Sequence, residues 1–190
     1  IKSLMDEMYA ADTSKKIRAV VQAKAKAGER VTTNPPYGYL KDSNNPKNWI
    51  IDPVASEVVK RIFQEAKSGK SLSEISKGLE SDKIFKPDRH RIEIGLKSIS
   101  SSSNVETLPY FWIRETLSAI LSREEYLGHT VNLRTRTKSY KDKRKVDNSK
   151  EDWLVFKNTH EAIIDQETFD IVQKMRSHKR SNQRYKNRIG

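Results

Sequence analysis

Cysteine is absent from the 190 residues of this chain, which excludes disulfide bonds and zinc sites built on thiolates. Long apolar runs are absent too, so the sequence predicts no segment that spans a bilayer. No secretion signal is visible, and we therefore expect a cytoplasmic protein with no membrane partner. Apolar residues make up only 35% of the chain and aromatic residues 8%, which predicts a lean core with basic appendages.

Positive charge is what the chain has in excess. Lys and Arg number 37 against 25 Asp and Glu, a net charge of +12. An excess of this size favours a polyanionic partner, nucleic acid before membrane. The first residue is Ile rather than Met, so we expect the chain to be cut from a longer protein.

The stretch Pro109 to Gly128 has the clearest amphipathic pattern and predicts a helix. The face predicted to be buried consists of Ile113, Leu117, Ile120 and Leu121. The opposite face carries Arg114, Glu115, Ser118, Ala119 and Ser122. These side chains are mostly short and form hydrogen bonds, a composition that lets a helix approach the floor of a major groove. An ordinary solvent-facing helix is the alternative.

The first 28 residues predict one long helix that ends at Gly28. Its start is apolar, at Leu4, Met5, Met8 and Tyr9, which suggests contact with another domain or a second copy. Its second half is basic, which suggests contact with phosphate. Residues 29–36 hold two prolines and predict an extended linker, either a segment for a minor groove or a plain connector.

The middle of the chain predicts a small helical domain. Residues 37–51 predict a short β-hairpin, and Asp52-Pro53 predicts the start of a helix that Gly69 ends. A capping box from Ser71 to Glu74 opens the next helix. Arg91 to Leu96 predict a possible short strand, followed by a serine-rich loop at residues 98–103.

After Gly128 the pattern alternates with period two. Residues 129–137 predict a strand paired with 153–156, and the basic segment between them predicts a wing that reaches phosphate or, alternatively, a solvated hairpin tip. Asp165 predicts the start of a last helix that runs to about Met175, followed by a basic tail. The four histidines are scattered without metal-ligand spacing, and no phosphate-cradling glycine loop or nucleophile motif is present. We therefore expect no catalytic residues and no cofactor in this chain.

Six segments in this order resemble the recombinase domain of the large serine recombinases, which include serine integrases and transposases of mobile elements. They are YAADTSKKIRA, PPYGY, WIIDPVASEVVKRIF, SLSEISKGL, AILSREEYLGH and EDWLVFKNTHEAIIDQETFDIVQ, spread from about Ala10 to Met175. Two features depart from the family pattern. One is the serine-rich insertion before Trp112, and the other is Asp82-Lys83 where members often have glycine.

The resemblance implies a mainly α fold with a small β component, a helix-turn-helix or winged-helix-like DNA-binding domain that follows a connector helix. It implies that the chain has four parts: the connector at residues 1–28, a minor-groove linker at 29–36, the recombinase domain at 37–175 and a basic tail at 176–190. The family's serine nucleophile would lie in a catalytic domain before residue 1, which would also mediate self-association. Zinc is expected only in a downstream zinc-ribbon domain.

We therefore predict that the chain binds a recombination half-site in double-stranded DNA, as part of the integration or excision of a mobile element. The residues predicted to contact DNA are Lys15, Arg18, Lys26, Arg30, Thr32, Thr33, Asn34, Arg114, Glu115, Ser118, Ser122, Arg134, Arg136, Lys141, Lys143, Arg144 and Lys145. A winged-helix transcriptional regulator with no recombinase activity is the main alternative. A basic RNA-binding protein is disfavoured by the low aromatic content.

Overall fold

The structure is a computed structural model and describes residues 2–99 and 104–189. The α-helices are α1 (Lys2–Lys26), α2 (Pro53–Lys67), α3 (Leu72–Ser81), α4 (Pro87–Glu93), α5 (Asn104–Thr107), α6 (Arg114–Ile120) and α7 (Gln166–Ile189). The strands are β1 (Tyr39–Lys41), β2 (Trp49–Ile51), β3 (Thr130–Asn132), β4 (Thr135–Thr137), β5 (Lys145–Asp147) and β6 (Leu154–Phe156). Short 3₁₀ turns are η1 (Glu124–Leu127) and η2 (Lys150–Asp152). The predicted mainly α fold with small β pairs is confirmed.

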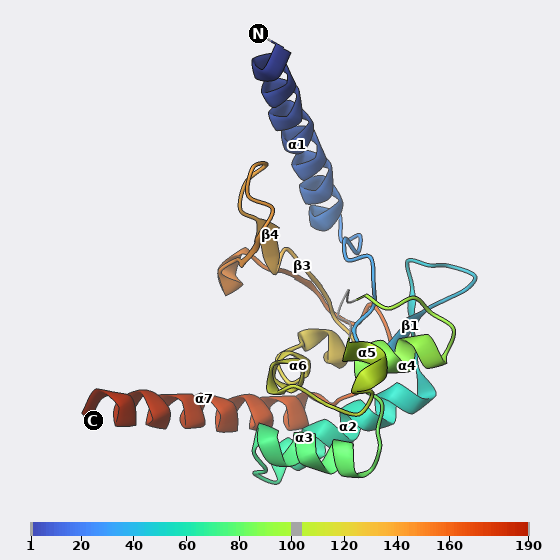
Figure 1. Ribbon diagram of the computed structural model, residues 1–190, viewed down its shortest axis with the longest axis vertical. Helices are drawn as coiled ribbons and strands as arrows, with labels where there is room; N and C mark the ends of the chain where they lie inside the picture. The colour runs from blue at the N-terminus through green and yellow to red at the C-terminus, as the bar shows by residue number, and fades with distance from the viewer. Residues whose placement is uncertain (1, 100–103, 190) are drawn as a thin grey trace.

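Within the described residues, one apolar core joins α2, α3, α6 and α7. Helix α2 packs against α7 and α3, and α3 packs against α6. Phe63, Trp112 and Tyr126 are the largest side chains that are fully buried between them. Helix α1 and the C-terminal part of α7 project away from this core, as Figure 1 shows, and α1 stands apart from the helical part of the molecule.

Local capping signals fix where α2 and α3 begin. The Asp52 carboxylate accepts hydrogen bonds from the backbone N–H of Val54 and of Ala55, each at 3.0 Å. The Ser71 hydroxyl accepts from the N–H of Glu74, whose carboxylate accepts from the N–H of Ser71 at 2.7 Å. Both predicted helix starts are therefore confirmed, because each depends only on neighbours in the sequence.

Helix α3 ends without the glycine that the resemblance leads one to expect. Lys83 adopts a left-handed backbone with φ of 52°, the conformation that glycine usually supplies after a helix. The preceding residue, Asp82, forms an ion pair with Arg61 of α2 at 2.7 Å. This contact ties the end of α3 to α2 and helps to hold Lys83 in its strained conformation.

The helix predicted over residues 109–128 is much shorter than expected. Only Arg114–Ile120 forms α6, and the chain then turns into η1. Ile113, predicted to be buried, is 48% exposed because it precedes the helix in an extended conformation. Trp112 is buried instead, and its indole N–H donates to the carbonyl of Ile84 at 2.9 Å. Tertiary packing of Trp112 therefore decides where α6 begins.

The strand predicted at Arg91–Leu96 is also wrong. Pro87 occupies the first turn of α4, which runs through Glu93. The His90 side chain is buried and its Nε2 lies 2.7 Å from Asp52 Oδ2. This long-range contact favours helix over the alternating pattern of the sequence. The predicted serine loop falls partly on residues 100–103, which lie outside the described residues.

The second hairpin is a ribbon in two parts. Strand β3 pairs with β6, placing Thr130 opposite Phe156, and β4 pairs with β5, placing Thr135 opposite Asp147. Leu133, with φ of 59°, interrupts the strand predicted over 129–137. The basic segment thus carries a β-ladder of its own. Helix α7 continues past Met175, where the sequence predicts its end, to Ile189.

Candidate nucleic-acid interface

Helix α1 is exposed along most of its length. The predicted contact residues Lys15, Arg18 and Lys26 are all exposed, whereas Ala25 near the helix end is fully buried. Apolar residues on the first turns, such as Met5 and Tyr9, are also exposed. The helix thus presents its basic second half to solvent, and only its last turn is packed.

The end of α1 is held by the β3 strand. Asn132 is fully buried, and its side-chain amide donates to the carbonyl of Glu29 at 2.8 Å while its oxygen accepts from the N–H of Val31 at 3.3 Å. Gly28 turns the chain with φ of 79°, and a Cβ there would lie 3.2 Å from the Phe156 ring. The direction in which α1 leaves the domain is therefore fixed by contacts more than a hundred residues away in the sequence.

Arg30 is the centre of a cluster that we call the linker anchor, formed by Arg30, Trp49, Thr130 and His160. The Arg30 guanidinium lies over the Trp49 ring, 3.8 Å from its centroid. It donates to the Lys47 carbonyl at 2.6 Å, to Thr130 Oγ1 at 3.0 Å and to His160 Nδ1 at 3.1 Å. The predicted minor-groove arginine is thus engaged within the protein.

The His160 ring is held neutral in this anchor. Its Nε2 lies 2.9 Å from the Glu125 carbonyl oxygen, so Nε2 carries the hydrogen and Nδ1 accepts from Arg30. The pKa of His160 is lowered to about 4, chiefly by burial and also by the neighbouring Arg30 charge, against the opposing effect of the hydrogen bond to the Glu125 carbonyl. A second proton would face the guanidinium, so protonation would oppose the anchor.

The three linker residues after the anchor face solvent. Thr32, Thr33 and Asn34 are exposed, and the chain is buried again at Pro35 and Pro36. The linker is therefore tied at both ends and exposed between them. This is the arrangement that a segment lying in a groove requires.

The predicted recognition face divides into two parts. Arg114 and Glu115 are exposed at the start of α6. Ser118 and Ser122 are only partly exposed, because the Ser122 hydroxyl donates to the Ser118 carbonyl at 2.7 Å and Arg176 of α7 donates to Ser118 Oγ at 2.8 Å. Arg176 of α7 thus covers this face at Ser118, whereas Ala119 and the start of α6 are accessible.

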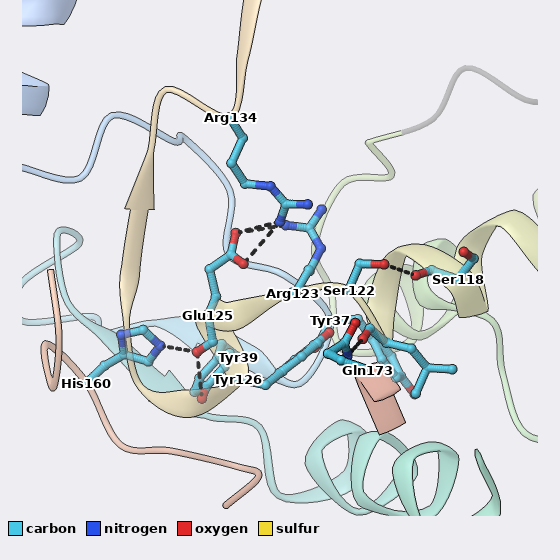
Figure 2. A network of polar contacts seen from close by, with 11 residues as sticks. Tyr37, Tyr39, Ser118, Ser122, Arg123, Glu125, Tyr126, Arg134, His160 and Gln173 are labelled. Atoms are coloured by element: carbon cyan, nitrogen blue, oxygen red, sulfur yellow. Dashed lines mark hydrogen bonds and ion pairs between the residues drawn. The ribbon is translucent and has the colours of Figure 1, made fainter. Parts of the chain in front are cut away.

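Arg134 is also engaged within the protein. Its guanidinium lies 3.2 Å from the carboxylate of Glu125, a residue only 3% exposed, and 4.9 Å from the centroid of the Trp153 ring. Arg123 pairs with the same carboxylate at 3.2 Å, as Figure 2 shows. A buried carboxylate that two guanidinium groups share is a structural feature, because without these partners its charge would be buried and uncompensated.

The ribbon tip reaches toward α1. In Figure 1 the hairpin that contains β4 rises beside this helix, and Lys141 pairs with Glu7 of α1 at 3.3 Å. Arg144 pairs with Asp142 at 2.6 Å. Both of these cations are nevertheless exposed, as are the other predicted cations of the tip, Arg136, Lys143 and Lys145. The basic half of α1 and the tip thus supply the accessible positive charge on this side of the molecule.

Sequence reasoning missed the residues that hold these surfaces in place, above all Trp49, Glu125, Asn132 and His160. Nothing local marks them, since each acts through partners distant in the sequence. Within residues 2–99 and 104–189, no group of three or more His, Asp or Glu side chains is placed to hold a metal ion. In the same part of the chain, no helix has the length and apolarity to cross a membrane.

Comparison with known proteins gives a family match and similar solved structures. The Recombinase family model matches residues 53–179. One matched structure is described as "Crystal Structure of a LSR-DNA Complex", with TM-score 0.49 and 15% identity, over 86% of this chain and 38% of that chain. Another, from Listeria innocua, is described as "Sequence Requirements of the Listeria innocua prophage attP site", with TM-score 0.45 and 16% identity, over 87% of this chain and 50% of that chain. The chain thus spans half or less of these solved chains, and no curated protein matches it.

Proposed function

The chain belongs to the Recombinase family, and we propose that it is the part of a large serine site-specific recombinase that binds double-stranded DNA at a recombination half-site. The observation that carries this proposal is the family match over residues 53–179, which covers the whole helical core. The accessible cations of α1 and of the ribbon tip support it, because they are placed to neutralise phosphates. The same match leads us to set aside the winged-helix regulator.

Each surface has its own role in this proposal. Helix α1 is the connector, the exposed linker residues Thr32–Asn34 lie in a minor groove, and the start of α6 enters the adjacent major groove. The ribbon tip contacts the phosphate backbone. Arg30 and Arg134 are left out of the contact set, because their guanidinium groups are engaged by the linker anchor and by Glu125.

The remaining parts of the family's activity are assigned to domains outside this chain. The serine nucleophile, which forms a covalent link to DNA, and the self-association surface would belong to a catalytic domain connected through α1. A zinc-ribbon domain would follow α7. The chain itself is therefore expected to bind DNA without cutting or joining it.

Selection from a random-sequence duplex library by gel retardation tests the proposal. We expect an enriched duplex, bound with a log–log salt slope of about −4 to −7, corresponding to roughly five to eight neutralised phosphates. Supercoiled plasmid carrying two copies of the enriched duplex should yield no covalent adduct with the chain. No enrichment together with a salt slope near zero would refute the proposal.

A further inference from the structure

An apolar rim lies directly before α6 on the surface. It consists of Leu108, Phe111 and Ile113, which are 46%, 44% and 48% exposed. These residues border a hollow of about 240 Å³ that Val105 and Thr116 also line. Large apolar side chains gathered around one hollow mark a binding surface more often than singly exposed ones do.

The outward position of Phe111 and Ile113 is enforced by the residue between them. Trp112 is 1% exposed, and its indole N–H donates to the Ile84 carbonyl at 2.9 Å while its own carbonyl accepts from the Ser76 hydroxyl. In an extended segment, successive side chains point to opposite sides. Anchoring Trp112 in the core therefore turns its two neighbours to the outside in a fixed geometry.

The rim adjoins the polar residues proposed to read DNA. Ile113 is followed by the exposed Arg114 and Glu115, and Thr116 lines the hollow itself. Among the base-edge features of a major groove, the thymine 5-methyl group is the apolar one, and guanine and cytosine offer partners for Arg and Glu. A surface that joins apolar, guanidinium and carboxylate groups matches this set of features. The net charge of +12 favours DNA over a protein partner.

We propose that Phe111 and Ile113 are specificity-determining residues that contact thymine methyl groups in the major groove of the bound half-site. This inference rests on the proposed function and adds to it a second kind of readout beside hydrogen bonding. It extends base discrimination from Arg114 and Glu115 at the start of α6 to the segment that precedes this helix. Leu108 forms the outer edge of the same rim.

The test compares the duplex enriched from the random library with the same duplex carrying deoxyuridine in place of thymidine. The replacement removes only the 5-methyl groups, which lie in the major groove, and so leaves minor-groove contacts in place. Each methyl group that is buried at the interface should strengthen binding about fourfold. We expect the unaltered chain to bind the uracil duplex more weakly by at least this factor.

Variants locate the effect on the protein. Phe111→Ala and Ile113→Ala should each reduce the thymine-to-uracil affinity ratio, and Ile113→Val should give an intermediate ratio. The control is Ile94→Ala, which removes an isoleucine that is 41% exposed after α4 and should keep the ratio of the unaltered chain. Melting temperatures of all four variants check that they are folded.

The outcomes separate this inference from the proposed function. Sequence-selective binding with equal affinity for both duplexes would overturn the methyl contact and leave DNA binding standing. A thymine preference that persists in both alanine variants, or that Ile94→Ala also removes, would equally overturn it. Failure to enrich any duplex would instead overturn the proposed function itself.

Discussion

Replacing Arg30 by alanine should destabilise the fold while leaving the electrostatic part of DNA binding unchanged. The side chain joins the linker to three other segments, because it lies on Trp49 and donates to Lys47 of the same hairpin, to Thr130 and to His160. Without it, the polar groups of the anchor lose a charged donor and the Trp49 face is exposed to water. Replacing an arginine that contacts phosphate would instead leave the stability of the fold unchanged and weaken the electrostatic part of DNA binding.

The magnitude follows from these contacts. A hydrogen bond to a charged group contributes about 1.5–3 kcal/mol and a cation–π contact about 0.5–2 kcal/mol. The contributions are not additive, and the anchor is only partly buried, so we expect a loss of about 2–4 kcal/mol in the free energy of unfolding. For a chain of this length that corresponds to a fall in melting temperature of roughly 5–15 °C.

Thermal melting and salt titration together form the assay. Arg30→Lys should restore little stability, because an ammonium group lacks the planar fork that stacks and donates in several directions. Arg114→Ala, which removes an exposed guanidinium, is the matched control and should melt like the unaltered chain. At a temperature where all variants are folded, Arg30→Ala should keep the salt slope. Unchanged melting with a slope reduced by about one would refute the anchor.

Four further measurements test the remaining surfaces. Arg114→Ala should narrow the affinity gap between the enriched and random duplexes by about 1–3 kcal/mol, whereas Lys143→Ala should weaken both and flatten the salt slope by about one. If residues 32–34 occupy a minor groove, distamycin should compete with the chain for A·T-rich sites. DNA binding that distamycin does not weaken would show that these residues only connect α1 to the domain. Asn132→Ala should cost about 1–3 kcal/mol in denaturant unfolding, because the Glu29 carbonyl and the Val31 N–H lose their partner. The free energy of unfolding should fall as pH drops from 6.5 to about 4, because His160 is protonated at a higher pH in the unfolded chain than in the folded one. A His160→Asn variant with the same pH profile as the unaltered chain would contradict this.

The sequence predicted those parts of the fold that depend on near neighbours. Asp52, Pro53, Ser71 and Glu74 mark helix starts because their capping bonds span two or three residues, and Gly28 ends α1 for the same reason. Predictions failed where a distant contact outweighs the local pattern. Burial of Trp112 moves the start of α6, and the pairing of His90 with Asp52 makes a helix of an alternating segment.

The same distinction separates the candidate contact residues. Basic side chains are visible in a sequence, but their partners are not: Arg30 meets Thr130 and His160 across 100 and 130 residues. Arg134 likewise pairs with the buried carboxylate of Glu125, and its guanidinium lies over the Trp153 ring. Composition therefore overestimates the accessible charge, and only the structure separates cations that stabilise the fold from cations that are exposed to a ligand.

The linker joins these observations into one geometric constraint. Its start is held by Arg30 and Asn132, and its end is buried at Pro35 and Pro36. The three exposed residues between these points span about 10 Å when extended, and a minor groove is about 6 Å wide. The chain bends at Thr33 and Asn34, so the extended length is an upper limit for this bridge. Because α1 leaves at one end and the helical core begins at the other (Figure 1), a duplex under the linker would have α1 and the core on opposite sides of that groove. The anchor thus holds α1 and the core in a fixed relation, and we expect Arg30 to act through these contacts rather than through the DNA.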